Sequence, residues 1–133
     1  MNIDVPYGIT RRLQNGSLDE ARGRITAALA AEGFGILTEI DLQKTLLNKL
    51  GVQIEPYVIL GACNPKIAHA AISAQPGIGL LLPCNVVLTK DGDDVVVSVA
   101  SPKTMFATAG DVPGMGPLVE DAEARIRRAV ANA

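Results

Sequence analysis

The chain has 133 residues, which is enough for one domain with a core of its own. Hydrophobic residues make up 48% of it and aromatic residues only 3%, so we expect a globular protein with a core of Val, Ile, Leu and Ala. The net charge of −2 argues against a nucleic-acid-binding protein, and the scarce aromatics argue against stacking on single strands. We therefore expect a single domain over residues 1–133 with no nucleic acid as a partner.

The N-terminal residues lack the basic segment and apolar stretch of a signal peptide. The longest apolar run, around Leu80–Leu82, is interrupted by Pro83 and Asn85 and falls far short of the roughly 20 residues of a membrane-spanning helix. We expect a cytoplasmic protein without a membrane partner. The two cysteines are then expected to be reduced, and they are too few for a disulfide scaffold.

In the first half of the chain, Ser17 and Glu20 form a capping-box pattern at the start of a helix over residues 17–33. The apolar residues of this segment fall on one face, and Gly33 is expected to end it. Residues 34–41 predict a strand. Residues 41–51 predict a shorter helix that ends at Gly51, with Asp41 as its expected N-cap.

The second half begins with a strand over residues 56–63 that is apolar on both faces, followed by a helix over residues 64–73. Residues 80–90 and 94–101 predict two strands, joined by a tight turn at Asp91-Gly92. Residues 104–117 predict a loop. The last helix is expected to bury one face and to turn Arg125, Arg127 and Arg128 toward solvent; the buried face holds Leu118, Ala122, Ile126, Ala129 and Val130.

The predicted order is β-α-β-α-β-α-β-β-α, which indicates an α+β fold with two layers, the helices lying on one face of a mostly antiparallel sheet. Alternation along the strand after Pro83 places Cys84 on the core face, where it packs as a small hydrophobe, and Asn85 on the opposite face. Helices on one side only would leave apolar sheet surface such as Val87 uncovered. Because such surface usually marks a partner or ligand site, we expect a homodimer.

Two Cys-Asn pairs provide the candidate site. Cys63 precedes a predicted helix N-terminus, which is able to lower a thiol pKa, and it is therefore the candidate catalytic residue; the alternative is a small inert residue at a tight junction. Asn64 is a candidate ligand-binding residue whose structural role is the helix cap. Asn85 is a candidate because an amide within an apolar strand must find hydrogen-bond partners in backbone, ligand or partner chain.

Glu39 and Cys84 complete the candidate ligand-binding residues. Glu39 lies within a strand, and if it approached Cys63 or Asn85 the group would be able to move protons or hold a polar ligand. The spacing of the two cysteines and the single His69 does not match a structural zinc site, so no metal ligand is assigned. A disulfide between Cys63 and Cys84 requires Cα atoms within about 7 Å. The sequence predicts no particular cofactor.

Three segments carry a resemblance to a known family. They are TEIDLQKTLLNKLG at residues 38–51, PYVILGACNP at 56–65 and LLLPCNVV at 80–87, followed by a hairpin and a Ser-Pro step. In this order, over roughly residues 34–105, the chain resembles the bacterial and archaeal family known as domain of unknown function 302. The resemblance implies a small α+β fold of the TATA-binding-protein-like class and a homodimer, and it implies no reaction.

The leading functional hypothesis is a homodimeric ligand-binding or stress-related module, with a pocket for a small molecule lined by Cys63, Asn85 and Glu39. The absence of a base near the cysteines in the sequence favours this module over an enzyme. The alternatives are a thiol-based redox protein or enzyme that uses Cys63, a cysteine-ligated metal-binding protein, and a purely structural dimer.

Overall fold

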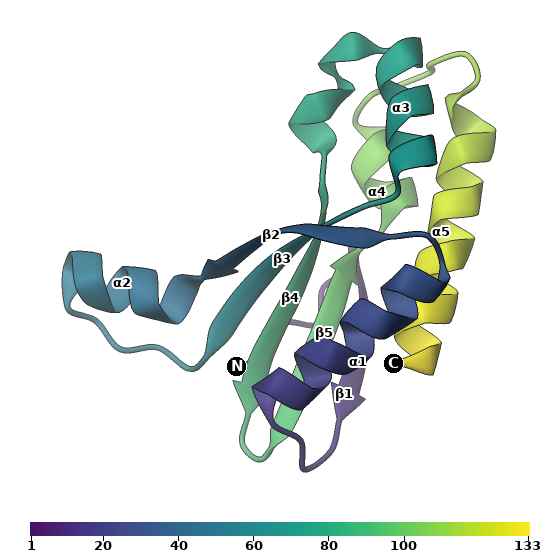
Figure 1. Cartoon of the computed structure of the whole chain (residues 1–133). Helices are drawn as coiled ribbons and strands as arrows, with labels where there is room; N and C mark the ends of the chain where they lie inside the picture. The colour runs from purple at the N-terminus through teal and green to yellow at the C-terminus, as the bar shows by residue number, and fades with distance from the viewer.

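The chain forms five strands and five α-helices, and the computed structural model describes all 133 residues (Figure 1). The strands are β1 (Gly8–Leu13), β2 (Gly35–Asp41), β3 (Tyr57–Cys63), β4 (Cys84–Asp91) and β5 (Asp94–Ala100). The helices are α1 (Leu18–Ala31), α2 (Leu42–Leu50), α3 (Pro65–Ala74), α4 (Pro102–Ala107) and α5 (Met115–Asn132), with a 3-10 helix η1 over Pro76–Leu81.

The strands form one sheet in the order β1-β5-β4-β3-β2, and every neighbouring pair is antiparallel. The expectation of an α+β fold with a mostly antiparallel sheet is confirmed. The β4–β5 hairpin closes with Asp91 opposite Asp94, and Gly92 has a φ of 62°. A glycine with positive φ at the first central position is the requirement of a type II′ turn, so the predicted turn at Asp91-Gly92 is confirmed.

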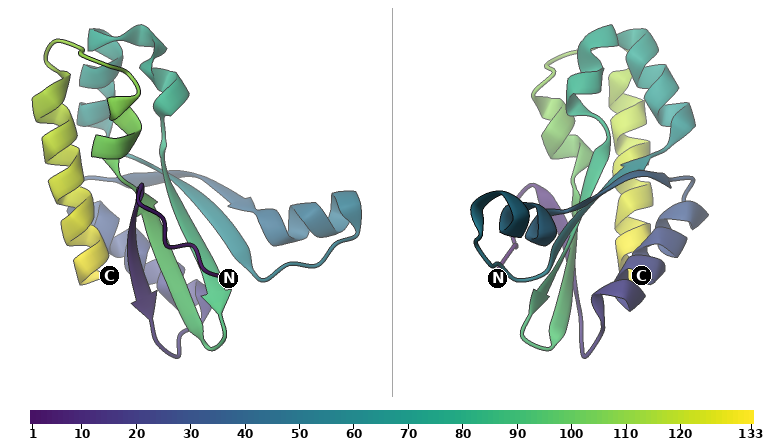
Figure 2. Two further views of the ribbon diagram at one scale, coloured as in Figure 1. Left: turned by 180° about the vertical axis from the view of Figure 1, so that it is seen from behind. Right: turned by 60° about the vertical axis from the view of Figure 1, so that its left-hand side comes forward.

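Helices α1 and α5 cover one face of the sheet, as the two turned views show (Figure 2). The main core lies between these helices and the strands. Its fully buried members include Ile25 and Leu29 of α1, Val86 and Leu88 of β4, and Ile126 of α5. The apolar stripes predicted for the two helices are therefore the core-facing sides, since α5 also buries Ala122, Ala129 and Val130.

The predicted helix ends have the expected capping residues. Ser17 accepts a hydrogen bond from the N–H of Glu20 at 3.1 Å. Asp41 accepts from the N–H of Lys44 at 3.0 Å, and Asn64 from that of Ile67 at 3.3 Å. These side chains satisfy backbone donors that a helix leaves free at its start, which explains why sequence locates the starts of α1, α2 and α3.

Two predictions about the second half were wrong. Residues 80–83 do not extend β4, because residues 76–81 form η1 and β4 begins only at Cys84. The predicted loop over residues 104–117 contains most of α4, whose N-cap is Ser101. Leu80 to Leu82 have the apolar character of a buried strand, and periodicity does not distinguish such a short run from a short helical segment.

A buried carboxylate holds α4 to α5. The Oε1 atom of Glu123 accepts from the hydroxyl of Ser101 at 2.7 Å and from the N–H of Lys103 at 3.1 Å. Its Oε2 atom accepts from Nε of Arg127 at 2.9 Å. Burial by itself raises the pKa of Glu123, but the hydrogen bonds from Ser101, Lys103 and Arg127 outweigh it and lower the pKa below its ordinary value. Both carboxylate oxygens of Glu123 are hydrogen-bonded, and the residue has a structural role.

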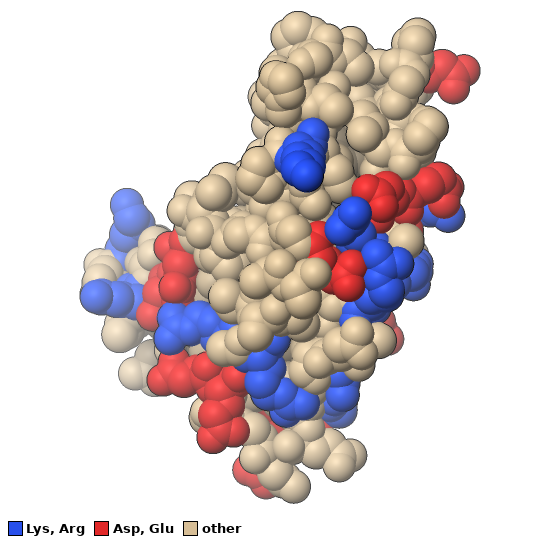
Figure 3. All heavy atoms as spheres, turned by 45° about the vertical axis from the view of Figure 1, so that its right-hand side comes forward, with Lys and Arg blue, Asp and Glu red and all other residues tan.

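The arginines expected to point to solvent on α5 form ion pairs. Arg128 binds Glu32 at 2.8 Å, across to the end of α1, while Arg125 and Arg127 pair with carboxylates of their own helix. At the C-terminal end of α5, Arg11 of β1 donates to the carbonyls of Val130, Ala131 and Ala133 at 2.7 to 3.2 Å. Charged side chains crowd this flank, whereas the end built by α3 and η1 is nearly free of them (Figure 3).

Helix α2 projects from the body of the molecule on an extension of β2 and β3 (Figures 1 and 2). We call residues 37–57 the arm. None of the residues of α2 is buried, although the helix is amphipathic. Large apolar side chains are exposed along the arm, with Leu50 at 70%; they are Leu37, Ile40, Leu47, Leu50 and Val52.

Candidate functional site

The face of the sheet opposite α1 and α5 carries no helix across it. Strand alternation sends Val86 and Leu88 of β4 into the core, and Asn85 and Val87 to this open face. The register places Asn85 opposite Gly61 of β3, so that the two lie on the same side of the sheet. The prediction that Cys84 and Asn85 lie on opposite faces is therefore confirmed.

A cleft of about 420 Å³ lies on the open face. Its floor is formed by β1, β5, β4 and β3, its side by the N-terminal segment (residues 1–7), and its end by Met105 of α4. We call it the sheet-face cleft; its lining residues are Asn2, Ile3, Val5, Tyr7, Gly8, Tyr57, Asn85, Val87, Ser98, Ala100 and Met105. This volume falls within the range of roughly 300–1,000 Å³ that is usual for small-molecule sites.

Several polar groups in the cleft have no partner within the protein. The side chains of Asn85, Tyr7 and Tyr57 make none of the hydrogen bonds in the structure. Ser98 differs, since its hydroxyl lies 2.7 Å from that of Thr10 on the neighbouring strand. An amide and two phenols are thus available to an incoming molecule.

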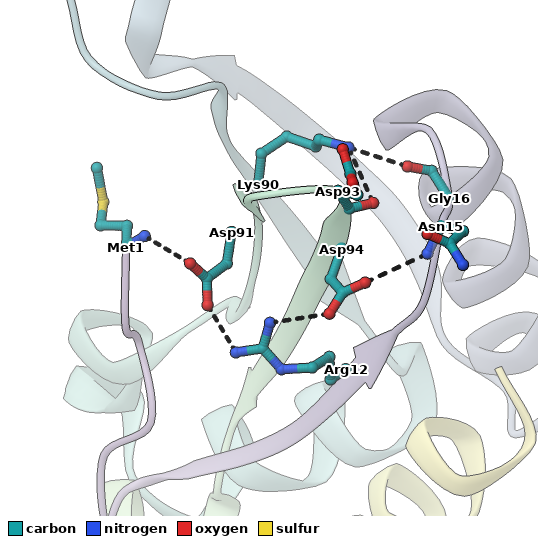
Figure 4. A network of polar contacts seen from close by, with 8 residues as sticks. All are labelled: Met1, Arg12, Asn15, Gly16, Lys90, Asp91, Asp93 and Asp94. Atoms are coloured by element: carbon teal, nitrogen blue, oxygen red, sulfur yellow. Dashed lines mark hydrogen bonds and ion pairs between the residues drawn. The ribbon is translucent and has the colours of Figure 1, made fainter.

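The N-terminal segment lies along the open face and is fastened at both ends. At its start, the amino group of Met1 lies 3.4 Å from Oδ1 of Asp91 in the β4–β5 hairpin (Figure 4). Arg12 binds the same carboxylate at 2.7 Å and Asp94 at 3.3 Å, and the hydrogen bond from Arg12 is the main cause of the lowered pKa of Asp91. At its other end, the carbonyl of Tyr7 accepts from the N–H of Ser101 at 2.8 Å. The segment is thereby held as the side wall of the cleft.

Two glycines on the open face allow neighbouring side chains to approach the sheet closely. A Cβ atom at Gly8 would lie 2.5 Å from the hydroxyl oxygen of Ser98. A Cβ atom at Gly61 would overlap the side chain of Thr38 and lie 2.8 Å from Cγ of Pro83. Glycine within a strand usually marks such a close approach, and the one at position 61 leaves Asn85 without a facing side chain on β3.

Both cysteines line a separate pocket, at the junction of the sheet with α3, α4 and α5. This apolar pocket has a volume of about 30 Å³ and is also lined by Phe34, Leu82 and Phe106, among others. Burial raises the pKa of Cys84 to about 11, and the neighbouring Cys63 adds to the increase. Cys84 is therefore a protonated thiol at neutral pH, in keeping with the predicted packing role. The two cysteines are free thiols.

The candidate residues do not form one site. Glu39 lies opposite Leu60, on the side of the sheet that faces α1, and it pairs with Arg22 of that helix. Asn85 opens onto the other face, and Cys63 lies at the end of β3 in the apolar pocket. The prediction that Cys63, Asn85 and Glu39 share a pocket was wrong, because strand alternation places Glu39 and Asn85 on opposite sides of the sheet. Asn64 and Cys84 line the apolar pocket with Cys63.

The structure contains no group of three or more His, Cys, Asp or Glu side chains placed to hold a metal ion. His69 is exposed on α3 and does not line the pocket that contains the two cysteines. No helix combines the length and apolar character needed to span a bilayer.

Residues 9–133 match the model of a protein family described as "Domain of unknown function DUF302". The chain belongs to the DUF302 family. The match extends the resemblance seen in residues 34–105 to α5 and nearly all of β1. No curated protein matches the chain.

The fold of this DUF302 protein is similar to that of a solved structure described as "uncharacterized conserved protein DUF302 from Bacillus stearothermophilus". The two share 24% sequence identity with a TM-score of 0.86, over 96% of this chain and 98% of the other. At that level of identity the similarity concerns the fold. The two proteins therefore share one fold over nearly their whole lengths.

Among the residues that line the sheet-face cleft, sequence analysis identified Asn85 as a candidate and placed Val87 on the uncovered face of the sheet. Tyr7 and Tyr57, which are the only tyrosines of the chain, both line it, as do Ser98 and Met105. One signal was available in the sequence, since the chain has only two tyrosines and one of them, Tyr57, lies in a predicted strand. Which face they share depends on the strand order, and that order was not predicted.

Proposed function

We propose that this DUF302 protein is a homodimeric module that binds a small molecule in the sheet-face cleft. The observation that carries the proposal is the cleft itself, which has about 420 Å³ of space, apolar walls and a few polar groups without internal partners. Asn85 and the two tyrosines are the groups proposed to orient the ligand. Free thiols at positions 63 and 84 are compatible with a reducing, cytoplasmic location.

The arm supports the dimer. An amphipathic helix without a single buried residue gains stability when its apolar side is covered, and the chain's own contacts with α2 leave none of its residues buried. Its exposed Leu47 and Leu50, with Ile40 and Val52 beside it, form a patch of the kind that usually marks a protein interface. We infer that a second copy of the chain covers the arm.

The thiol-based alternative receives less support. Cys84 has a raised pKa, and the apolar pocket contains no histidine or carboxylate able to act as a base for Cys63. The only histidine, His69, is exposed and absent from the pocket lining. A nucleophilic thiol needs a thiolate-stabilising group or a base, and the pocket supplies neither as a side chain.

Native mass spectrometry of freshly purified protein tests both parts of the proposal. We expect a dimer, with a fraction carrying additional small-molecule mass that is released on denaturation. Val87→Trp is the variant that fills the cleft, because Val87 lies on its floor and is only partly exposed. It is expected to keep the dimer and lose the added mass, whereas Ile72→Trp, on the exposed side of α3, serves as a control of equal size and keeps both.

The dimer has its own test. Leu50→Asp places a charge on the arm at a residue that is 70% exposed in the single chain, so folding is unaffected. We expect this variant to be monomeric by native mass spectrometry. A dimer unchanged by Leu50→Asp would contradict the assignment of the arm, and equal ligand mass on wild type and Val87→Trp would contradict the assignment of the cleft.

A further inference from the structure

The lining of the sheet-face cleft contains no Lys, Arg, Asp, Glu or His. Charged residues make up 20% of the chain, so about two of the 11 lining residues would be charged if the cleft had the average composition. We propose that the ligand is an uncharged, flat molecule that carries a carboxamide-like hydrogen-bonding group. The inference rests on the proposed function and names the class of molecule that the same cleft accepts.

A charged ligand is excluded because the charged groups nearest to the cleft already pair with one another. Asp91 and Asp94 share the guanidinium of Arg12, and the amino group of Met1 also binds Asp91 (Figure 4). These groups lie at the hairpin end and do not line the cleft. A charged ligand would leave water without gaining a counter-ion, and an unpaired charge in an apolar site is unfavourable.

The preference for a flat molecule follows from the side chains that supply the walls. Tyr57 lies on the floor and Tyr7 on the N-terminal segment, and aromatic rings gain most from stacked or edge-to-face contact with another ring. Met105 closes the end of the cleft, and a thioether also packs favourably against an aromatic ring. Four aromatic side chains exist in the chain, and both of those that carry a hydroxyl line this cleft.

The preference for an amide follows from Asn85. Its side chain offers donors and an acceptor next to each other, and neither is used within the protein. A carboxamide presents the complementary acceptor and donor and is therefore able to make two hydrogen bonds at once. Carboxylates offer only acceptors and amidinium groups only donors, so each matches half of the Asn85 amide.

Three probes of nearly identical shape separate these chemistries: benzamide, benzoate and benzamidinium. Binding is followed by the backbone amide NMR signals of the dimeric protein during titration with each. We expect benzamide to shift the signals of Asn85, Val87 and Ser98, and to bind at least about tenfold more tightly than either ion. Equal or tighter binding of benzoate or benzamidinium to wild type would overturn the inference, as would no shift with any of the three.

Asn85→Asp is the matched variant, because the residue is exposed and the side chains have nearly the same shape. We expect benzamide to bind about five- to tenfold more weakly and benzamidinium to become the preferred probe. An unchanged order of the probes in this variant would overturn the role of Asn85. Small-molecule mass that is lost with Val87→Trp, together with no benzamide binding, would remove the ligand class and leave the proposed function intact.

Discussion

Val86 and Val87 are neighbours on β4, and they lie in opposite environments. Val86 is fully buried beneath the helices, whereas Val87 lies partly exposed on the floor of the cleft. The same contrast holds for the two sides of the sheet as a whole. One side is covered by α1 and α5 and has its polar groups at the edges; the other is covered only by the N-terminal segment and carries an unpaired amide and two phenols.

We propose that the covered face provides stability and that the open face provides recognition. On the covered side, apolar side chains from strands and helices exclude water from one continuous core. On the open side, Thr89, Val96 and Ser98 are also buried but lie outside that core, and Asn85 and Val87 are exposed or partly exposed.

The largest difference is expected in thiol reactivity across Cys84 and Asn85. In a Cys63→Ala background, Cys84 on the covered face is compared with an Asn85→Cys, Cys84→Ala variant that moves the thiol to the open face. Because burial raises the pKa of Cys84 from an ordinary value of 9.0 to about 11, its thiolate fraction at pH 7 is lower than that of an ordinary cysteine by roughly 100-fold. Iodoacetamide labelling at neutral pH measures the rates, and similar rates for the two variants would contradict the contrast.

The next difference concerns stability and uses the valine pair. Val86→Ala removes two methyl groups from a fully buried site and is expected to lower the free energy of unfolding by about 2 kcal/mol. Val87→Ala is expected to cost less than half as much, about 0.5 kcal/mol, because its side chain is only partly buried. Urea denaturation of the two variants measures both values. Equal losses would mean that the open face is also part of the core.

A smaller effect is expected at Glu123, where the end of the covered side is held by hydrogen bonds. Glu123→Gln keeps the size but weakens the charge-assisted bonds to Ser101 and Arg127, at a cost of about 1 kcal/mol. Its pKa is lowered in the folded protein, so the stabilisation is present above the ordinary value of 4.5 and is lost as the pH falls through the folded value. Denaturation at pH 7 and at about pH 3 is expected to show the difference from wild type shrinking at the lower pH.

The smallest effect is expected at Glu39. Its partner Arg22 is 39% exposed and also binds Asp19, so the pair lies in water at the sheet edge. Glu39→Ala is expected to change stability by no more than about 0.5 kcal/mol and to leave benzamide binding as it is in wild type. A loss of binding in the NMR titration would return Glu39 to the candidate site.

Local signals in the sequence predicted much of this fold. Ser17, Asp41 and Asn64 each cap a helix by bonding a backbone N–H three residues later, and Gly92 forms the turn in which it lies. Each of these roles can be recognised without knowledge of the tertiary structure. Helix α4 was missed although it has a local cap, since Ser101 accepts from the N–H of Thr104; part of what holds this short helix in place comes from Glu123, which is 22 residues beyond Ser101 in the chain. Interactions over such separations have no local pattern.

The site was predicted less well than the fold for the same reason. Alternation along β4 correctly placed Asn85 on the face opposite Cys84, since that depends on one strand alone. Grouping Asn85 with Glu39 and Cys63 required the pairing of β2, β3 and β4, and the register places them in three different surroundings. The tyrosines of the cleft come from the N-terminal segment and β3, which meet only through the order of the strands.

The most direct test of the central claim is a crystal structure of the protein grown with benzamide. We predict its ring in the sheet-face cleft between the N-terminal segment and Tyr57, with the carboxamide about 2.9 Å from the side-chain amide of Asn85. Benzamide bound in the apolar pocket beside Cys84, or a cleft filled by the side chains of a partner chain, would contradict the assignment of the open face to small-molecule recognition.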